Sequence, residues 1–417
     1  MNILETINEL GKKAKDASIQ IRVLQKEKKM AAYQCLEKNI GKNTDQILNS
    51  NKLDIENAIA NDLSKPLINR LKVTEQSIAG IIKSITEIKN QPDPIGTVLE
   101  NWEQPNGLKF SKISVPLGVL GVIYESRPNV TVDASCLALK SNNALILRGG
   151  SDSYHTSKQL VKIITESFIE ANLPENIIQM IPTTDREAVD HLLEMKDYVN
   201  VIIPRGGKSL IKKINEKSKI PVIKHLEGLC HVYVDKEADI EIAKNIIFNS
   251  KLRRPEICGA AETLLIDSSI KEKALELIEP VYKAGCVIRG DDFITNLDKN
   301  FERANDEDWS TEYLDKIISV KIVDGVIGAT DHINNYSSNH TESIITENEE
   351  TFMNFYNNID SAIILKNAST QFADGGEFGF GAEIGISTDK LHVRGPVGAK
   401  HLTTFKYIVH GNGQVRP

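Results

Sequence analysis

Cys258 is the residue whose surroundings most favour nucleophilic chemistry. It lies in the segment RRPEICGAAETLLI, where small residues follow the sulfur and Arg253 and Arg254 precede it. A thiolate attacks carbonyl carbon, and nearby cations or backbone N–H groups favour the thiolate form. The apolar run 261–266 is typical of a buried strand. The segment predicts a nucleophile on a tight turn before a core strand, although a lone cysteine is more often a packing residue.

The other cysteines are interpreted differently. Cys35, Cys136 and Cys286 are expected to be packing residues, whereas Cys230, near the expected domain junction, is the rival nucleophile. An odd number of cysteines without a CxxC pair fits neither a disulfide framework nor a zinc site. A reducing compartment and no bound metal are therefore expected.

Two glycine-rich turns, in LILRGGSDS and IIPRGGKSL, each follow an expected strand and precede a helix. Glycine pairs let a ligand approach the backbone, and Ser151 is expected to cap the following helix beside a phosphate. Two such turns in one sheet predict a dinucleotide site, although no GxGxxG is present and Ile202 replaces the first P-loop glycine. The candidate cofactor-binding residues are Arg148, Gly149, Gly150, Ser151, Pro204, Arg205, Gly206 and Gly207.

Two further segments carry candidate polar groups. Asn129, after the strand in VPLGVLGVIYESRPNV, can donate its amide to an oxyanion, or can simply cap the next helix. The glycine-rich stretch 367–398 predicts a long ordered loop, and such loops are usually functional. Its Ser369, His392 and Arg394 can meet an anionic substrate, or the stretch can be a structural crossover.

The elements that must position these residues follow a simple order. Residues 1–90 show helical periodicity, with the lysines at 26–29 expected on a solvated face, and Pro92 ends the region. Asn106-Gly107 predicts a hairpin that can add to a partner subunit's sheet. Strands alternating with helices then predict two parallel sheets. The expected strands are 119–124, 144–147, 177–181, 200–203, 231–234, 262–266 and 318–323, with a terminal strand in LTTFKYIVHG.

Composition limits the class of protein. The 417 residues are 41% hydrophobic and carry a net charge of −7, so several soluble domains are expected, with no nucleic acid as main partner. There is no signal-peptide pattern and no 18-residue apolar run, so no membrane association is expected and a cytoplasmic enzyme is the default.

Taken together, the quoted motifs resemble the gamma-glutamyl phosphate reductase (glutamate-5-semialdehyde dehydrogenase) family of the aldehyde dehydrogenase superfamily, over about residues 5–410. The resemblance implies an α/β fold with two Rossmann-like parallel-sheet domains and a small oligomerisation element. It implies an NADPH-binding domain at 1–95 and 115–235, a catalytic domain at 236–398, and oligomerisation segments at 96–114 and 399–417, in a homo-dimer or tetramer.

The same resemblance implies a reaction in proline biosynthesis. L-glutamate 5-phosphate is reduced with NADPH to L-glutamate 5-semialdehyde and phosphate, through a Cys258 thioester whose oxyanion Asn129 stabilises. Ser151 replaces a glutamate that NAD-preferring relatives often carry, so NADP is favoured, and Glu312 resembles the glutamate that holds the nicotinamide ribose. Hydrolytic relatives carry a glutamate that activates water, and His225 stands at that position here, although Glu227 could be the equivalent residue instead. The absence of the glutamate suits a reductase, because a water-activating base would hydrolyse the thioester.

Alternative functions remain open at this level. Another thiol-dependent acyl-transfer or aldehyde dehydrogenase enzyme of the same fold is the main one, and a scaffold that has lost activity is another. The resemblance occupies the whole chain, so the glutamate 5-kinase that makes the acyl phosphate is expected to be a separate protein and a possible partner.

Overall fold

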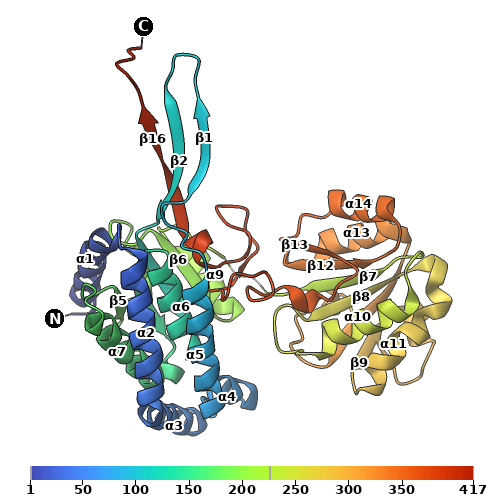
Figure 1. Cartoon of the computed structure of the whole chain (residues 1–417). Coiled ribbons are helices and arrows are strands. Elements are labelled where there is room, and N and C mark those ends of the chain that lie inside the picture. The colour runs from blue at the N-terminus through green and yellow to red at the C-terminus, as the bar shows by residue number, and fades with distance from the viewer. Residues whose placement is uncertain (1, 225–226, 417) are drawn as a thin grey trace. The chain divides into compact units, whose positions relative to one another are not determined.

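The chain forms two compact units, which are described separately (Figure 1). The computed structural model describes residues 2–224 and 227–416. The first unit comprises Met1–His225, Gly379–Gly385 and Val397–Pro417, and the second comprises Leu226–Phe378 and Ile386–Pro396. The domain boundaries expected from the sequence are not tested by this division and stay a prediction.

The first unit begins with the expected helices, α1 (Ile3–Ile21), α2 (Lys26–Lys42), α3 (Thr44–Ala60), α4 (Lys65–Leu71) and α5 (Glu75–Asn90). Their apolar faces are buried, and Asn2 and Thr74 each form a capping box at a helix start. The expectation of a fully solvated lysine face on α2 is wrong for Lys29. Its side chain is buried, pairs with Asp93 at 2.6 Å and donates to the Lys140 carbonyl oxygen.

A parallel sheet in the order β5-β4-β3-β6 follows, as the alternating pattern predicted. Its strands are β3 (Val119–Tyr124), β4 (Ala144–Gly149), β5 (Ile178–Met180) and β6 (Val201–Arg205). The connecting helices are α6 (Asn129–Lys140), α7 (Tyr154–Glu170), α8 (Glu187–Glu194) and α9 (Lys208–Lys217), with a short 3-10 turn, η1 (Ser151–Ser153), before α7. Because β3 lies between β4 and β6, both glycine-rich turns flank its carboxyl end.

The predicted hairpin and terminal strand form one antiparallel sheet in the order β1-β2-β16. The strands are β1 (Val98–Glu103), β2 (Lys109–Pro116) and β16 (Thr403–His410), preceded by η5 (Ala399–Leu402). Figure 1 shows this sheet standing out from the helices of the first unit. Trp102 stacks on Phe110 at 5.0 Å between ring centroids, and Tyr407 contacts Trp102 edge-on. Apolar side chains on the sheet remain exposed, including those of Val98 and Val409.

The second unit contains a parallel sheet in the order β10-β9-β11-β8-β7-β12-β13. Its strands are β7 (Cys230–Val234), β8 (Ala261–Asp267), β9 (Val287–Gly290), β10 (Glu302–Arg303), β11 (Ile317–Val323), β12 (Thr341–Ile345) and β13 (Ile363–Lys366). Its helices are α10 (Ile240–Leu252), α11 (Ala274–Lys283), α12 (Asp292–Thr295), α13 (Gly325–Tyr336) and α14 (Glu349–Asn358), with 3-10 turns η2 (Ser268–Lys273), η3 (Asp308–Ser310) and η4 (Thr370–Phe372). The loop after η4 contains the short pair β14 (Ile386–Ser387) and β15 (Gly395–Pro396).

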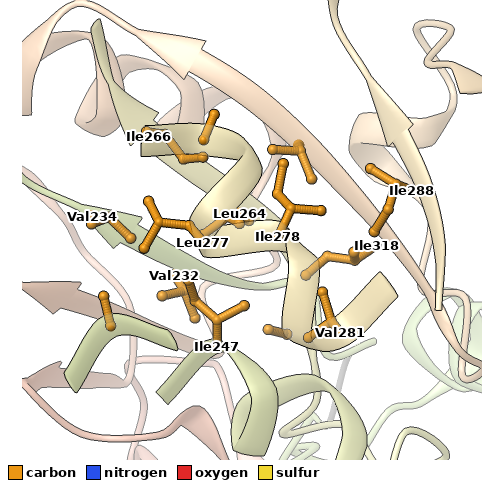
Figure 2. Packing of buried hydrophobic residues seen from close by; sticks show 14 of the residues in the cluster. Val232, Val234, Ile247, Leu264, Ile266, Leu277, Ile278, Val281, Ile288 and Ile318 are labelled. Carbon is orange, nitrogen blue, oxygen red and sulfur yellow. The ribbon is translucent and has the colours of Figure 1, made fainter. Parts of the chain in front are cut away.

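Alternate residues of β7 and β8 face the two sides of this sheet. Val232 and Leu264 pack against Leu277 and Ile278 of α11 (Figure 2), whereas Tyr233 packs on the other side with residues of α13 and α14. Strands buried on both faces therefore read as apolar runs, which is why β7 and β8 could be predicted. No helix among residues 2–224 and 227–416 has the length and apolarity needed to span a bilayer.

Candidate active site

Cys258 lies on the expected turn, between the end of α10 and the start of β8. The Ala260 N–H donates to the Ile257 carbonyl oxygen at 3.0 Å and closes the turn. The Cys258 side chain is half-buried and packs beside Ile363 and Ala373. The thiol thus remains partly accessible on a backbone that the core strand β8 anchors.

Gly228, which was not among the residues predicted from the sequence, fixes the other side of this turn. A Cβ atom at this position would lie 1.8 Å from the Cys258 carbonyl oxygen and 2.6 Å from its Cα. The Gly228 N–H donates to the Glu312 carboxylate at 2.8 Å. Glu312, which resembles a ribose-binding glutamate, therefore also holds the backbone that packs against the candidate nucleophile.

Cys230 is poorly suited to nucleophilic attack. Its side chain is fully buried, and this burial raises the pKa of the thiol well above its usual value. The Cys230 thiol donates to the Cys258 carbonyl oxygen at 3.1 Å. It therefore supports the turn that carries Cys258. Cys136 and Cys286 are buried as expected, whereas Cys35 is half-exposed.

The two arginines before Cys258 are held by neighbouring side chains. The Arg253 guanidinium donates to the Gln371 side chain at 3.4 Å, and Arg254 pairs with Glu256 at 3.1 Å. Gln371 in turn donates to the Ser250 carbonyl oxygen, which ties η4 to the end of α10. Both guanidinium groups are thus engaged by Gln371 and Glu256, and neither of these contacts directs a positive charge at Cys258.

The candidate substrate residues of the second unit occupy two environments. Ser369 is buried, accepts the Gln371 N–H as the cap of η4, and shares a hydrogen bond with Ser250. His392 is exposed, while Arg394 is half-buried and pairs with Asp360 at 2.7 Å. Lys390 and Arg394 hold the pKa of the Asp360 carboxyl below its usual value. Ser369 therefore belongs to the surroundings of Cys258, because the carbonyl oxygen of the next residue, Thr370, faces Gly259. Arg394 is instead held by its contact with Asp360.

Asn129 is the first residue of α6 and is exposed. The alternative that it caps this helix is wrong, because Pro128 occupies the cap position and α6 has no side-chain cap. Its amide instead donates to Asp133 at 3.2 Å, and Ser84 donates to the same carboxyl group at 2.8 Å. Burial raises the pKa of Asp133. One amide hydrogen of Asn129 is thus directed at Asp133, and the other can meet an oxyanion.

The turn after β4 differs in part from expectation. Ser151 opens η1 and does not cap α7, whose cap position is Ser153. The first N–H groups of α7 are already satisfied, because His155 and Thr156 donate to the buried carboxylate of Asp54 at 3.0 and 2.7 Å. The start of α7 is therefore occupied by a protein carboxylate, and no local sequence pattern predicts this contact because Asp54 is distant in the chain.

Arg148 retains one unused donor at this turn. Its guanidinium donates to the carbonyl oxygens of Gly149 and Thr184 at 2.8 and 3.0 Å, and burial lowers its pKa. Its Nε atom is buried without a hydrogen-bond partner among the described residues, as is the Ser153 hydroxyl. Buried donors of this kind usually have a partner, so these atoms fit a polar ligand beside the turn.

The turn after β6 is closed by Glu125. The Gly207 N–H donates to the Glu125 carboxylate at 3.0 Å, and a Cβ at Gly206 would lie 2.6 Å from the same oxygen. Pro204 pairs in register with Ile123 within the sheet. An anionic ligand that binds the Gly207 N–H must replace Glu125 there. With that exchange, the residues of both turns fit a dinucleotide at the carboxyl edge of the sheet.

The structure thus groups the candidate residues by unit. Cys258, Glu312 and Ser369 belong to one region of the second unit, whereas Asn129 and the two glycine-rich turns belong to the carboxyl edge of the first sheet. Gly228, Asp133 and Glu125 were missed, although the spacing of Asn129 and Asp133 on one helix was a usable signal. His225 lies outside the described residues. Among those that are described, no group of three or more His, Cys, Asp or Glu side chains is placed to hold a metal ion.

Comparison with known proteins identifies the family of this chain. Residues 6–293 match the aldehyde dehydrogenase family. The chain is 51% identical to the gamma-glutamyl phosphate reductase of Bartonella bacilliformis, covering 98% of this chain and 99% of that one. It is 49% identical to that of Brucella suis, over 100% of this chain and 99% of that one. The crystal structure of the Thermotoga maritima gamma-glutamyl phosphate reductase matches with a TM-score of 0.95 and 39% identity, over 99% of this chain and 100% of that one. This chain therefore belongs to the aldehyde dehydrogenase family, among the gamma-glutamyl phosphate reductases.

Proposed function

We propose that this chain reduces L-glutamate 5-phosphate to L-glutamate 5-semialdehyde and phosphate. The semialdehyde cyclises spontaneously to 1-pyrroline-5-carboxylate, a precursor of proline. The observation that carries the proposal is the accessible Cys258 thiol on an anchored turn, in a chain matched from end to end by relatives of this activity. The main alternative, another acyl-transfer or aldehyde dehydrogenase reaction, is not favoured by those relatives.

The Cys258 thiolate attacks the carbonyl carbon of the acyl phosphate and forms an S–C bond. The resulting oxyanion accepts hydrogen bonds from the Asn129 side-chain amide and the Cys258 backbone N–H. These neutral donors stabilise the negative charge that develops on the oxygen. Collapse of the tetrahedral centre breaks the C–O bond and expels phosphate, leaving a thioester on Cys258. After reduction, the S–C bond of the thiohemiacetal breaks and the aldehyde leaves. Phosphate is a good leaving group, so the acylation step needs little acid catalysis.

The cofactor is a nicotinamide dinucleotide, and we propose NADPH. When bound, it supplies the hydride that reduces the thioester. Ser151 itself is neutral and carries no carboxylate that would repel a 2′-phosphate, which favours NADPH over NADH. The residues proposed to hold it are Arg148, Gly149, Gly150, Ser151, Pro204, Arg205, Gly206, Gly207 and Glu312.

Substrate recognition is proposed to involve Arg394, His392 and Ser369. The Arg394 pair with Asp360 offers a guanidinium whose buried Nε has no partner among the described residues. A substrate carboxylate or phosphate can compete for such a group because charge-assisted hydrogen bonds to guanidinium are strong.

Assembly is proposed to use the β1-β2-β16 sheet. Its exposed apolar residues and open strand edges suit addition to a second copy of the chain, as a dimer or tetramer. A separate glutamate 5-kinase is a further proposed partner, because an acyl phosphate hydrolyses readily in water and benefits from direct transfer. Repeated failure of crosslinking to capture the kinase would count against that transfer.

The reverse reaction tests the proposal most directly. The whole chain is incubated with semialdehyde, phosphate and either NADP or NAD, and the absorbance of the reduced nicotinamide is followed. We expect turnover with NADP to exceed that with NAD. Cys258→Ser should lower kcat by about 1,000-fold or more, in line with loss of a catalytic nucleophile.

A matched control is Cys286→Ser, because Cys286 is also in the second unit but is buried and lies outside the Cys258 turn. This variant should keep normal turnover. Near-normal activity of Cys258→Ser would remove Cys258 from the mechanism. Alkylation of Cys230 before Cys258 would identify the rival thiol instead.

A further inference from the structure

A cationic pocket in the first unit lies beside Asn129. It has a volume of about 380 Å³ and is formed by the end of α4, one side of α5 and the start of α6. Cavities of this size hold small ligands. Arg70 and Lys72 line it together with the Asn129 amide and the Asp133 carboxyl group. Of these four residues, only Asn129 was predicted from the sequence to be a site residue, as an oxyanion donor.

Neither cation is neutralised by a partner among residues 2–224 and 227–416. Among the described residues, neither the Arg70 guanidinium nor the Lys72 ammonium group forms a hydrogen bond or an ion pair, although the chain as a whole carries a net charge of −7. Arg70 is half-buried, so its guanidinium is partly removed from water. Asp133 is the only carboxyl group in the described lining, so two cationic side chains face a single carboxyl group. The pocket is therefore positively charged.

The backbone that carries the cations is held rigidly. Buried Asn51 donates to the Leu71 carbonyl oxygen and accepts the Val73 N–H, each at 2.8 Å, on either side of Lys72. The opposite wall is linked by the hydrogen bonds from Ser84 and Asn129 to Asp133. A preorganised anion site loses less entropy on binding than a mobile one.

We propose that Arg70, assisted by Lys72, binds an anionic group of the substrate, either its α-carboxylate or its phosphate, while Asn129 holds the reacting carbonyl oxygen at the edge of the same pocket. This inference rests on the proposed function, because it places the rest of the substrate beside the oxyanion donor. Arg70 thereby becomes a specificity-determining residue for a doubly anionic amino-acid derivative.

Gly80 offers an independent way to test occupancy. It lies on α5 in the pocket wall, and a Cβ at this position meets no atom within 4 Å. Gly80→Leu should therefore fill the pocket and fold normally, since leucine favours a helix more than glycine does. Arg70→Gln removes the cation and keeps a polar side chain of similar reach. Arg303→Gln is the matched control, because Arg303 is an exposed residue of the second unit.

The experiment uses the reverse reaction, in which the two anionic groups belong to separate reactants. We expect Arg70→Gln to raise one KM by about 10- to 100-fold with kcat changed much less, as for loss of a charged hydrogen bond. A rise in the KM for phosphate identifies the phosphate as the occupant, and a rise in the KM for semialdehyde identifies the carboxylate. Gly80→Leu should raise the same KM, and Arg303→Gln neither.

Unchanged KM values in both Arg70→Gln and Gly80→Leu, with an active wild-type chain, would overturn the inference. An inactive wild-type chain would overturn the proposed function instead. Calorimetric titration with inorganic phosphate and, separately, with L-glutamate would then test the pocket alone. Binding of one of these anions to the wild-type chain but not to Arg70→Gln would support the anion site. Failure of both anions to bind the wild-type chain would reject it.

Discussion

Replacing Gly228 with alanine should move the Cys258 turn. The added Cβ would lie 1.8 Å from the Cys258 carbonyl oxygen, whereas real Cβ contacts are essentially never shorter than 3.0 Å, so a shift of about 1.2 Å (3.0 − 1.8) is required. The contacted atoms are backbone, and no side-chain rotation can relieve the clash. A displacement of about 1 Å at a reacting group can cost about 100-fold in rate, and we expect a loss of that size in kcat.

Three measurements on Gly228→Ala separate displacement from unfolding. Steady-state turnover in the reverse reaction reports kcat, the rate of Cys258 alkylation followed by mass spectrometry reports the thiol's surroundings, and thermal unfolding reports stability. Gly328→Ala is the matched control, because Gly328 lies in α13 of the same unit and its Cβ would make only ordinary contacts of 3.5 Å or more. It should keep full activity. Wild-type turnover and alkylation in a folded Gly228→Ala protein would refute the reasoning.

Three further predictions concern stability. Burial lowers the pKa of His332 to about 3, so between pH 6.5 and 3 the unfolded chain binds a proton that the folded chain does not, and the free energy of unfolding falls by about 2 kcal/mol by pH 5. Urea unfolding at several pH values should show a smaller dependence of this free energy on pH in His332→Gln, and an unchanged dependence in the surface variant His191→Gln. Equal pH dependence in the two variants would contradict the prediction. Asp54→Ala should cost about 1–2 kcal/mol, seen as a lower Tm, because two N–H groups of α7 lose their acceptor, and an unchanged Tm would show that water replaces it. Leu264→Ala should cost about 3–5 kcal/mol in denaturant unfolding because Leu264 is fully buried in β8, and a loss below 1 kcal/mol would mean that the core collapses around the gap.

Much of the fold could be predicted because its signals are local. The strand β3 coincides with its expected bounds, and the hairpin follows from Asn106-Gly107. The first-unit helices and the terminal strand were also identified by periodicity. These elements are set by contacts between near neighbours in sequence, or by faces that are uniformly apolar.

The strand β12 shows why other elements were missed. Thr341, Glu342 and Ser343 are fully buried, yet their polar side chains hide the apolar run that marks a core strand. Glu342 is satisfied by His231, 111 residues away, and by hydroxyl groups of Ser337 and Ser361. Its burial therefore depends on partners that only the folded chain brings together. The adjacent strand β13 was missed with it, as were β9 and α14.

The candidate site divides in the same way. The local sequence of Cys258 was sufficient to predict a tight turn before a core strand, because small residues and an apolar run follow it, whereas its role as nucleophile rests on the rest of the chain and stays a prediction. The residues that hold this turn could not be predicted, because they are distant from Cys258 in the sequence. The Gly228 backbone packs so closely on Cys258 that a Cβ atom would clash, and Glu312 holds Gly228 by accepting its N–H. A carboxylate that resembles a cofactor ligand is thus also a restraint on the nucleophile's backbone. Loss of the Glu312 carboxylate would free Gly228 to move away from Cys258, so we predict that the proposed cofactor contact of Glu312 and the placement of the thiol are coupled through this side chain.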